Sequence, residues 1–220
     1  MNTKSFAQST LLAALLSIGS MAASAAVATL ENINSSDGGA TLFDPGTTSI
    51  AATMDPTVNM VTIGLMDFEA ITTDVTAPAT ALDTIFMTVV APTGYLITGI
   101  NYFESGTFDV TGGVVVADGS IVVGGTSTDL GTPTVVTDAV GTASGTFSYP
   151  VSVDVAGLTE VDISATNSLL AAVFGSPGAS AEIIKDVAYF EVELTAVPLP
   201  PAVWLFGTAV MGLMAVRSRK

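Results

Sequence analysis

The sequence predicts an all-β body, an antiparallel β-sandwich or jelly roll, between an N-terminal signal helix and a C-terminal transmembrane helix. Runs of β-branched and aromatic residues alternate with Gly, Pro, Asp and Asn through most of the chain, as in sheet proteins with many turns. No segment repeats with a period of about 20–50 residues, so neither a solenoid nor a propeller is indicated. We therefore expect a signal peptide over 1–26, a β-sandwich body over 27–196 and a tail containing the transmembrane helix over 197–220.

The first part, 1–26, has the regions of a secretory signal peptide. Lys4 supplies a positive charge, residues 11–18 form a short apolar stretch, and small residues follow it. The apolar stretch is too short to span a bilayer, so it directs export through the general secretion machinery. Three cleavage positions fit the small residues and remain open: after Ala25, after Ala26 and after Ala28.

The predicted strands of the body are runs of β-branched and aromatic residues bounded by turn residues. In chain order they cover 58–65, 82–91, 95–104, 145–149 joined to 151–155, and 181–196. Pro150 interrupts the fourth of these and has no N–H for a sheet, which favours a bulge or an edge strand there. Residues 167–174 fit either a short helix, capped by Asn167 or Ser168, or a buried strand.

A hairpin is predicted where Asp118 and Gly119 separate two apolar arms, 113–117 and 120–124. An Asp-Gly pair readily adopts positive φ at both central positions, as a type I′ turn requires. We therefore expect these two residues at the tip of a two-residue turn.

The last predicted strand has one apolar and one polar face, because side chains alternate along a strand. The apolar face holds Ala188, Phe190, Val192 and Leu194, and the polar face holds Lys185, Tyr189, Glu191 and Glu193. On the polar face, Lys185 is expected to form a surface ion pair with Asp186 or Glu182.

The composition excludes most enzyme chemistry. The chain contains no His and no Cys, which removes the Ser-His-Asp triad, thiol nucleophiles and the commonest zinc ligands. Carboxylates remain, and a glycosidase needs two of them roughly 5–10 Å apart across a sugar. Three pairs are expected on single strand faces: Asp67 with Glu69, Glu160 with Asp162, and Glu191 with Glu193. Because such pairs are common on solvated faces, we expect no enzyme, no catalytic residue, no metal site and no cofactor beyond weak Ca²⁺ association.

The charge of the body restricts its partners. The whole chain carries a net charge of −15, and without its two terminal parts Lys185 alone stands against 20 acidic residues, which gives −19. This charge repels nucleic acid, so nucleic acid is not an expected partner. Divalent cations could instead bridge the body to an acidic exopolysaccharide, since they prefer oxygen ligands. The expected contributors are Asp37, Asp118, Glu160, Asp162, Glu191 and Glu193.

Sugar binding is the main alternative to a structural role. It usually requires exposed aromatic rings, and aromatic residues make up 7% of the chain. The candidate platform residues are Tyr95, Tyr102, Tyr149 and Tyr189, although packing within the strands is the favoured role for each of them. A carbohydrate-binding module is therefore the second hypothesis, and a carboxylate-dependent hydrolase the third.

The C-terminal part, 197–220, has three segments in a fixed order. A proline motif comes first, and its prolines keep the backbone extended. Residues 202–216 carry no charge, and the 20 residues from Val197 to Val216 reach ~30 Å as a helix, the thickness of a bilayer core. Basic residues then end the chain and hold that end in the cytoplasm.

This tail resembles the PEP-CTERM sorting signal, in a variant whose motif is Val197, Pro198, Leu199 and Pro200. The corresponding membrane anchor includes Ala202, Trp204, Leu205, Phe206, Gly207, Gly212 and Leu213, and the basic stop is Arg217, Arg219 and Lys220. The missing Glu and the additional Pro201 leave the scissile bond open.

The resemblance implies that an exosortase, a membrane cysteine protease-transpeptidase of exopolysaccharide-producing Gram-negative bacteria, recognises the tail. The chain would be anchored in the inner membrane before cleavage and then delivered to the cell surface or the extracellular matrix. We therefore expect an exported, non-enzymatic protein associated with exopolysaccharide in a biofilm.

Overall fold

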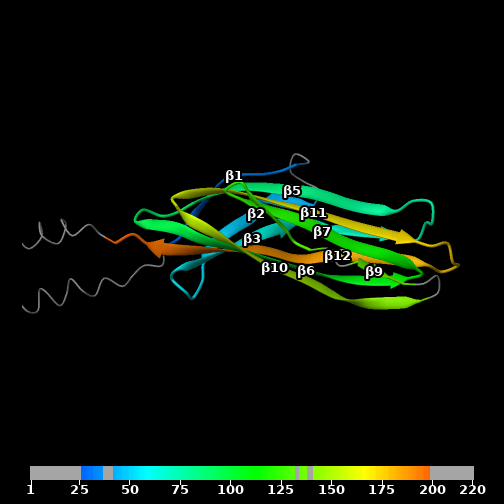
Figure 1. The fold of residues 1–220 in the computed structure, drawn as a ribbon. Helices are drawn as coiled ribbons and strands as arrows, with labels where there is room; N and C mark the ends of the chain where they lie inside the picture. Colours follow the sequence, from blue (N-terminus) through cyan, green and yellow to red (C-terminus); the bar gives the residue numbers. More distant parts are fainter. Residues whose placement is uncertain (1–25, 37–41, 132–133, 138–140, 199–220) are drawn as a thin grey trace, which may run out of the picture.

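The chain folds as two six-stranded antiparallel sheets packed face to face (Figure 1). The computed structural model describes residues 26–36, 42–131, 134–137 and 141–198. Within these ranges every regular element is a strand, so the predicted all-β sandwich is confirmed. The described ranges contain no helix long and apolar enough to cross a membrane. The expected signal helix and transmembrane helix lie outside them.

The first sheet, sheet A, has the strand order β1-β5-β11-β7-β8, and β9 also pairs with β7. Its strands are β1 (Thr29–Ser35), β5 (Ala79–Val90), β11 (Glu160–Val173), β7 (Gly113–Val123), β8 (Thr126–Asp129) and β9 (Thr134–Val136). The second sheet, sheet B, has the order β10-β6-β12-β3-β2, and β4 also pairs with β12. Its strands are β10 (Thr142–Leu158), β6 (Tyr95–Thr111), β12 (Ser180–Ala196), β3 (Val58–Leu65), β2 (Phe43–Ala52) and β4 (Glu69–Thr72).

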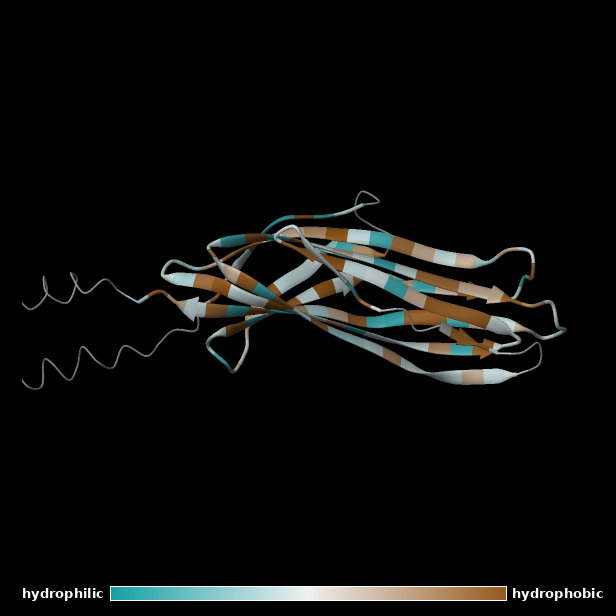
Figure 2. Cartoon of the chain, viewed as in Figure 1, coloured by the Kyte–Doolittle hydropathy of each residue, from teal (hydrophilic) through white to brown (hydrophobic). Residues whose placement is uncertain are grey.

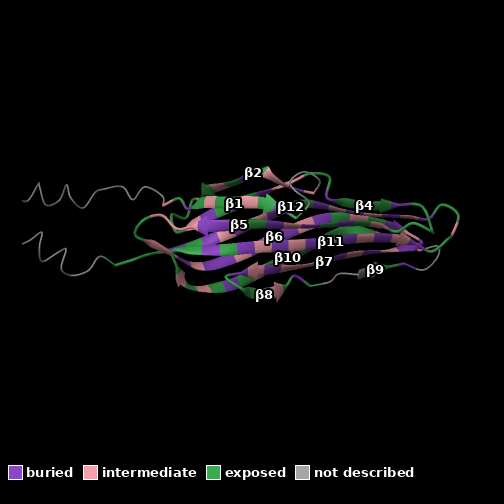
Figure 3. Ribbon diagram, turned by 90° about the horizontal axis from the view of Figure 1, so that it is seen from above, coloured by how far each residue is buried: buried purple, intermediate pink, exposed green. Residues whose placement is uncertain are grey.

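The core lies between the sheets and is built by alternation along the strands, which bulges interrupt in places. Brown and pale or teal residues alternate in Figure 2, and buried and exposed residues alternate in Figure 3. One inner row of sheet A aligns Ile85, Ala165 and Ile121, all fully buried. The facing rows of sheet B include Ile100 and Phe190. This alternation is the pattern that marked the strands in the sequence.

All five predicted strand regions are strands. The bounds of β3 match the prediction, and β6, β10 and β12 extend beyond it, while β5 begins earlier, at Ala79, and ends at Val90, one residue short of it. Pro150 lies in β10, the end strand of sheet B, as expected for a residue that cannot donate to a ladder. Residues 167–173 belong to β11, which resolves the open choice between helix and strand in favour of strand.

The predicted hairpin at Asp118 and Gly119 is wrong. Both residues lie inside β7, where they pair with Ser168 and Asn167 of β11. The positive φ angles occur instead at Gly124 and Gly125, in the turn between β7 and β8. A long partner strand outweighs the local turn preference of an Asp-Gly pair, because pairing and burial decide strand formation.

The predicted surface position of Lys185 is also wrong. The pairing of β12 with β6 shifts between Lys185, opposite Gly106, and Val187, opposite Ser105. Asp186 is therefore the extra residue of a β-bulge, which reverses the alternation on one side of it. Lys185 consequently faces the core with Ala188 and is only 3% exposed.

Both described ends of the chain lie at the same end of the sandwich (Figure 1). The side chain of Asn59 holds the first residues, since it accepts from the Ala28 N–H at 2.7 Å and donates to the Ala26 carbonyl at 2.9 Å. At the other terminus, the Val197 N–H donates to the Gly94 carbonyl at 2.8 Å. Gly94 lies in the turn after β5. Val90, at the end of β5, pairs with Thr29 near the first described residues.

Candidate functional site

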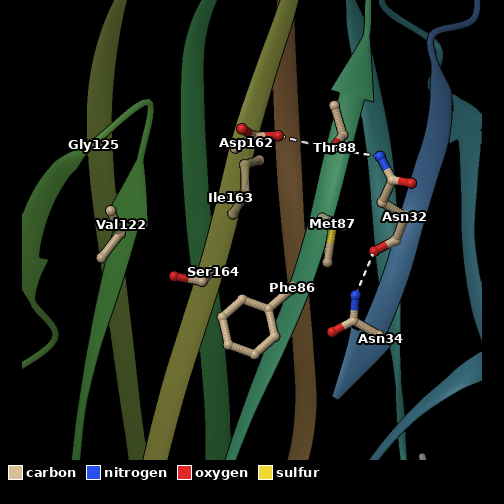
Figure 4. Close-up of a pocket in the computed structure, with 10 residues that line it drawn as sticks. All are labelled: Asn32, Asn34, Phe86, Met87, Thr88, Val122, Gly125, Asp162, Ile163 and Ser164. Carbon is tan, nitrogen blue, oxygen red and sulfur yellow. Dashed lines mark hydrogen bonds between the residues drawn. The ribbon is translucent and has the colours of Figure 1, made fainter. Parts of the chain in front are cut away.

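A shallow groove crosses the outer face of sheet A over β1, β5, β11 and β7 (Figure 4). Its volume is about 410 Å³. Its lining combines one aromatic ring with amide, hydroxyl and carboxylate groups, from Asn32, Asn34, Phe86, Met87, Thr88, Val122, Gly125, Asp162, Ile163 and Ser164.

Strand register creates the groove. Asn34 pairs with Phe86, Phe86 with Ser164, and Ser164 with Val122, so these four side chains form one row across the sheet. Phe86 is 40% exposed, and Figure 4 shows its ring beside Ser164.

A β-bulge shapes the rim of the groove. Pairing between β1 and β5 shifts between Glu31 and Asn34, and Asn32 has a φ of 53°, a conformation that asparagine tolerates better than most residues. The bulge bends β1 and aims the side chains of Asn32 and Asn34 toward the groove (Figure 4).

Hydrogen bonds order the polar side of the groove. The amide of Asn32 donates to the Thr88 hydroxyl at 3.3 Å, and this hydroxyl donates to Asp162 Oδ1 at 2.7 Å. The amide of Asn34 donates to the Asn32 carbonyl at 2.9 Å. A hydrogen-bonded line of polar groups beside an exposed aromatic side chain suits a ligand with one apolar face and many hydroxyls.

The groove does not have the two carboxylates that glycoside hydrolysis uses. Asp162 is the single acidic residue among its lining residues, whereas the general acid and the second carboxylate must both flank the scissile bond.

The pair Glu160 and Asp162 lies on sheet A and the pair Glu191 and Glu193 on sheet B, while Asp67 precedes β4, the strand of sheet B that begins at Glu69. Glu160 and Asp162 are exposed on sheet A, while Glu193 on sheet B accepts from the Asn101 amide at 2.9 Å. No group of three or more His, Cys, Asp or Glu able to hold a metal ion occurs in the described ranges. Asp37 lies outside those ranges.

The tyrosines do not form an exposed row. Tyr102 is buried, and Tyr95, Tyr149 and Tyr189 are half-buried. Tyr189 packs on Phe103 with ring centroids 5.1 Å apart. Sequence reasoning missed Phe86 because apolar residues occupy both faces of β5, which hides the outward position of a single ring.

Only the start of the expected sorting motif belongs to the described chain. Val197 and Pro198 follow β12 and are exposed. Leu199, Pro200, the anchor residues and the basic stop lie outside the described ranges.

No family model matches the chain, and no curated protein matches it.

Proposed function

We propose that this chain is an exported, non-enzymatic protein of the cell surface or extracellular matrix, sorted by an exosortase and associated with exopolysaccharide. The observation that carries the proposal is the tail itself, with its proline motif, uncharged stretch and basic end in that order. The protein is anchored in the inner membrane until the tail is cut.

The position of the tail on the body supports this proposal. Strand β12 lies at the centre of sheet B and leads directly to Val197 and Pro198, which are exposed. A protease can therefore reach the first two residues of the motif without unfolding the sandwich, because they follow directly after the last strand.

Replacing Pro198 and Pro200 with Ala tests the sorting step. The double variant should remain full-length in the inner membrane, because Ala allows a helix to extend through the motif and hide the cleavage site. Pro177→Ala, in an exposed loop, is the matched control and should be processed normally. Cell fractionation and immunoblotting measure both, and normal surface release of the double variant would contradict the proposal.

Deleting 197–220 tests the anchor separately. The shortened chain should be found as a soluble periplasmic protein, because the signal peptide remains and the anchor is lost. A shortened chain that still sediments with the inner membrane would show that another segment anchors it.

The groove on sheet A supports a second candidate function, a carbohydrate-binding module. A pyranose ring could stack on Phe86 while Asn32, Asn34 and Asp162 contact its hydroxyls.

Phe86→Ala should weaken binding by about 1–2 kcal/mol, which is roughly 5- to 30-fold in Kd. Affinity electrophoresis through exopolysaccharide purified from the producing bacterium measures this change. Phe174→Ala removes another exposed ring, outside the groove, and should leave binding unchanged. Equal binding by both variants would exclude the groove as the sugar site.

A further inference from the structure

Four polar side chains meet inside the apolar core, between the two sheets. Tyr102 and Glu104 come from β6, Lys185 from β12 and Asn167 from β11. Each of these residues is at most 3% exposed. Buried groups of this kind are costly unless they are paired, so their grouping in one place requires an explanation.

Hydrogen bonds connect the four side chains from one sheet to the other. Lys185 Nζ lies 2.6 Å from Glu104 Oε2, and the Tyr102 hydroxyl donates to the same oxygen at 2.6 Å. The Asn167 amide lies 3.2 Å from that hydroxyl. A lysine on sheet B and an asparagine on sheet A therefore contact opposite ends of one Tyr102–Glu104 pair.

Burial of Lys185 favours the loss of its proton, whereas two aromatic rings and Glu104 favour its charged form. Its Nζ lies 4.9 Å from the centre of the Phe68 ring and 5.9 Å from that of Phe43. Burial lowers the pKa of Lys185 to about 8, although the attraction of Glu104 opposes the shift. A neutral amine is a nucleophile, and a buried lysine acts as one when desolvation depresses its pKa.

The surroundings of Asn167 leave its carbonyl group available. Its Oδ1 is buried and has no hydrogen-bond partner among the described residues. The oxygen and nitrogen of an amide have nearly the same shape, so a half-turn places the oxygen toward the Tyr102 hydroxyl. Asp83 lies opposite Asn167 on β5, but its oxygens accept from Ser36, Phe43 and Thr84.

We propose that Lys185 and Asn167 form an intramolecular isopeptide bond that joins the two sheets, with Glu104 and Tyr102 relaying protons. Strands β11 and β12 lie in the middle of their sheets, so the bond crosses the centre of the sandwich. The chain has no cysteine and therefore no disulfide. An amide cross-link would stabilise the fold covalently without depending on redox conditions.

The reaction needs no co-reactant. Glu104 takes a proton from the Lys185 ammonium, and the free amine attacks Cγ of Asn167 while Tyr102 polarises the carbonyl oxygen. The new C–N bond forms, and the bond from Cγ to the original amide nitrogen breaks. The two protons that Lys185 loses leave with that nitrogen as ammonium, so Glu104 returns to its carboxylate form and nothing is oxidised or reduced.

Mass spectrometry of the purified full chain tests the proposal directly. The intact protein should be lighter than its sequence by one ammonia, and Asn167→Ala should show no deficit relative to its own sequence. Glu104→Gln, which keeps the side-chain shape but cannot take the proton, should also lack the deficit.

A digest at acidic residues locates the bond. Glu182 is the one acidic residue between Asn167 and Lys185, so cleavage after it separates the two. A peptide that still contains both must then be branched. Recovery of separate, unbranched peptides at their full masses from the wild-type protein would overturn the proposal, whether or not the variants fold. A deficit confined to an Asn167-Ser168 peptide without branching would also overturn it, because it would indicate a cyclic imide.

Discussion

Asp83 is a buried carboxylate with no cationic partner in the described part of the chain, and its replacement by Ala tests how hydrogen bonds stabilise the sandwich. It is fully buried on β5. Its Oδ1 accepts from the Ser36 hydroxyl at 2.6 Å and the Thr84 N–H at 2.7 Å, and its Oδ2 accepts from the Phe43 N–H at 3.1 Å. Phe43 begins β2 of sheet B, so Asp83 connects the two sheets at this point.

The groups that donate to Asp83 differ in whether another acceptor remains when Asp83 is replaced by Ala. The Thr84 N–H also donates to the Ser36 hydroxyl at 3.1 Å. The Ser36 N–H donates to Asp83 Oδ1 at 3.2 Å and also to the Thr84 carbonyl at 2.8 Å. The Phe43 N–H is buried and has Asp83 as its acceptor. The variant loses this hydrogen bond to a charged group and leaves the buried Phe43 N–H unpaired. The free energy of unfolding should therefore fall by about 2–4 kcal/mol.

Urea unfolding of wild type, Asp83→Ala and the exposed control Asp154→Ala measures this cost. The control should stay within about 0.5 kcal/mol of wild type. In thermal unfolding, the Asp83 variant should lose roughly 5–15 °C in Tm for a domain of this size. A free energy of unfolding within the control range would refute the reasoning, because the Phe43 N–H would then have found another partner.

Three further predictions follow from the packing and the charge. Gly119→Ala should destabilise the protein by about 1–3 kcal/mol in urea unfolding, because a Cβ there would lie 2.6 Å from the Thr166 carbonyl, whereas Ser120→Ala should be nearly neutral. Asn59→Ala should accelerate hydrogen exchange at the Ala28 amide, since it removes the acceptor of that N–H. Retention in purified exopolysaccharide should fall when a chelator removes Ca²⁺ and Mg²⁺ at constant ionic strength, and return with Ca²⁺ but not with NaCl; unchanged retention would exclude cation bridging.

The sequence alone determined the features that depend on local alternation and on composition. Runs such as 58–65 and 187–196 have the two-residue period of strands with one buried face, and they predicted the sandwich. The absence of His and Cys excluded the commonest catalytic chemistries. The order of segments in 197–220 is likewise a property of the sequence, and it carries the sorting proposal.

Only the tertiary structure decided the positions that depend on a partner strand. A bulge at Asp186, set by the pairing of β12 with β6, moved Lys185 from the surface into the core. The length of β11 kept Asp118 and Gly119 inside a strand despite their turn preference.

The groove around Phe86 and the contact network of Glu104 and Asn167 also depend on how strands pair and pack. Each brings together residues from strands that are far apart in the chain. The periodicity along one strand predicts the face on which a side chain lies. Cross-strand register and sheet packing determine which other side chains it contacts.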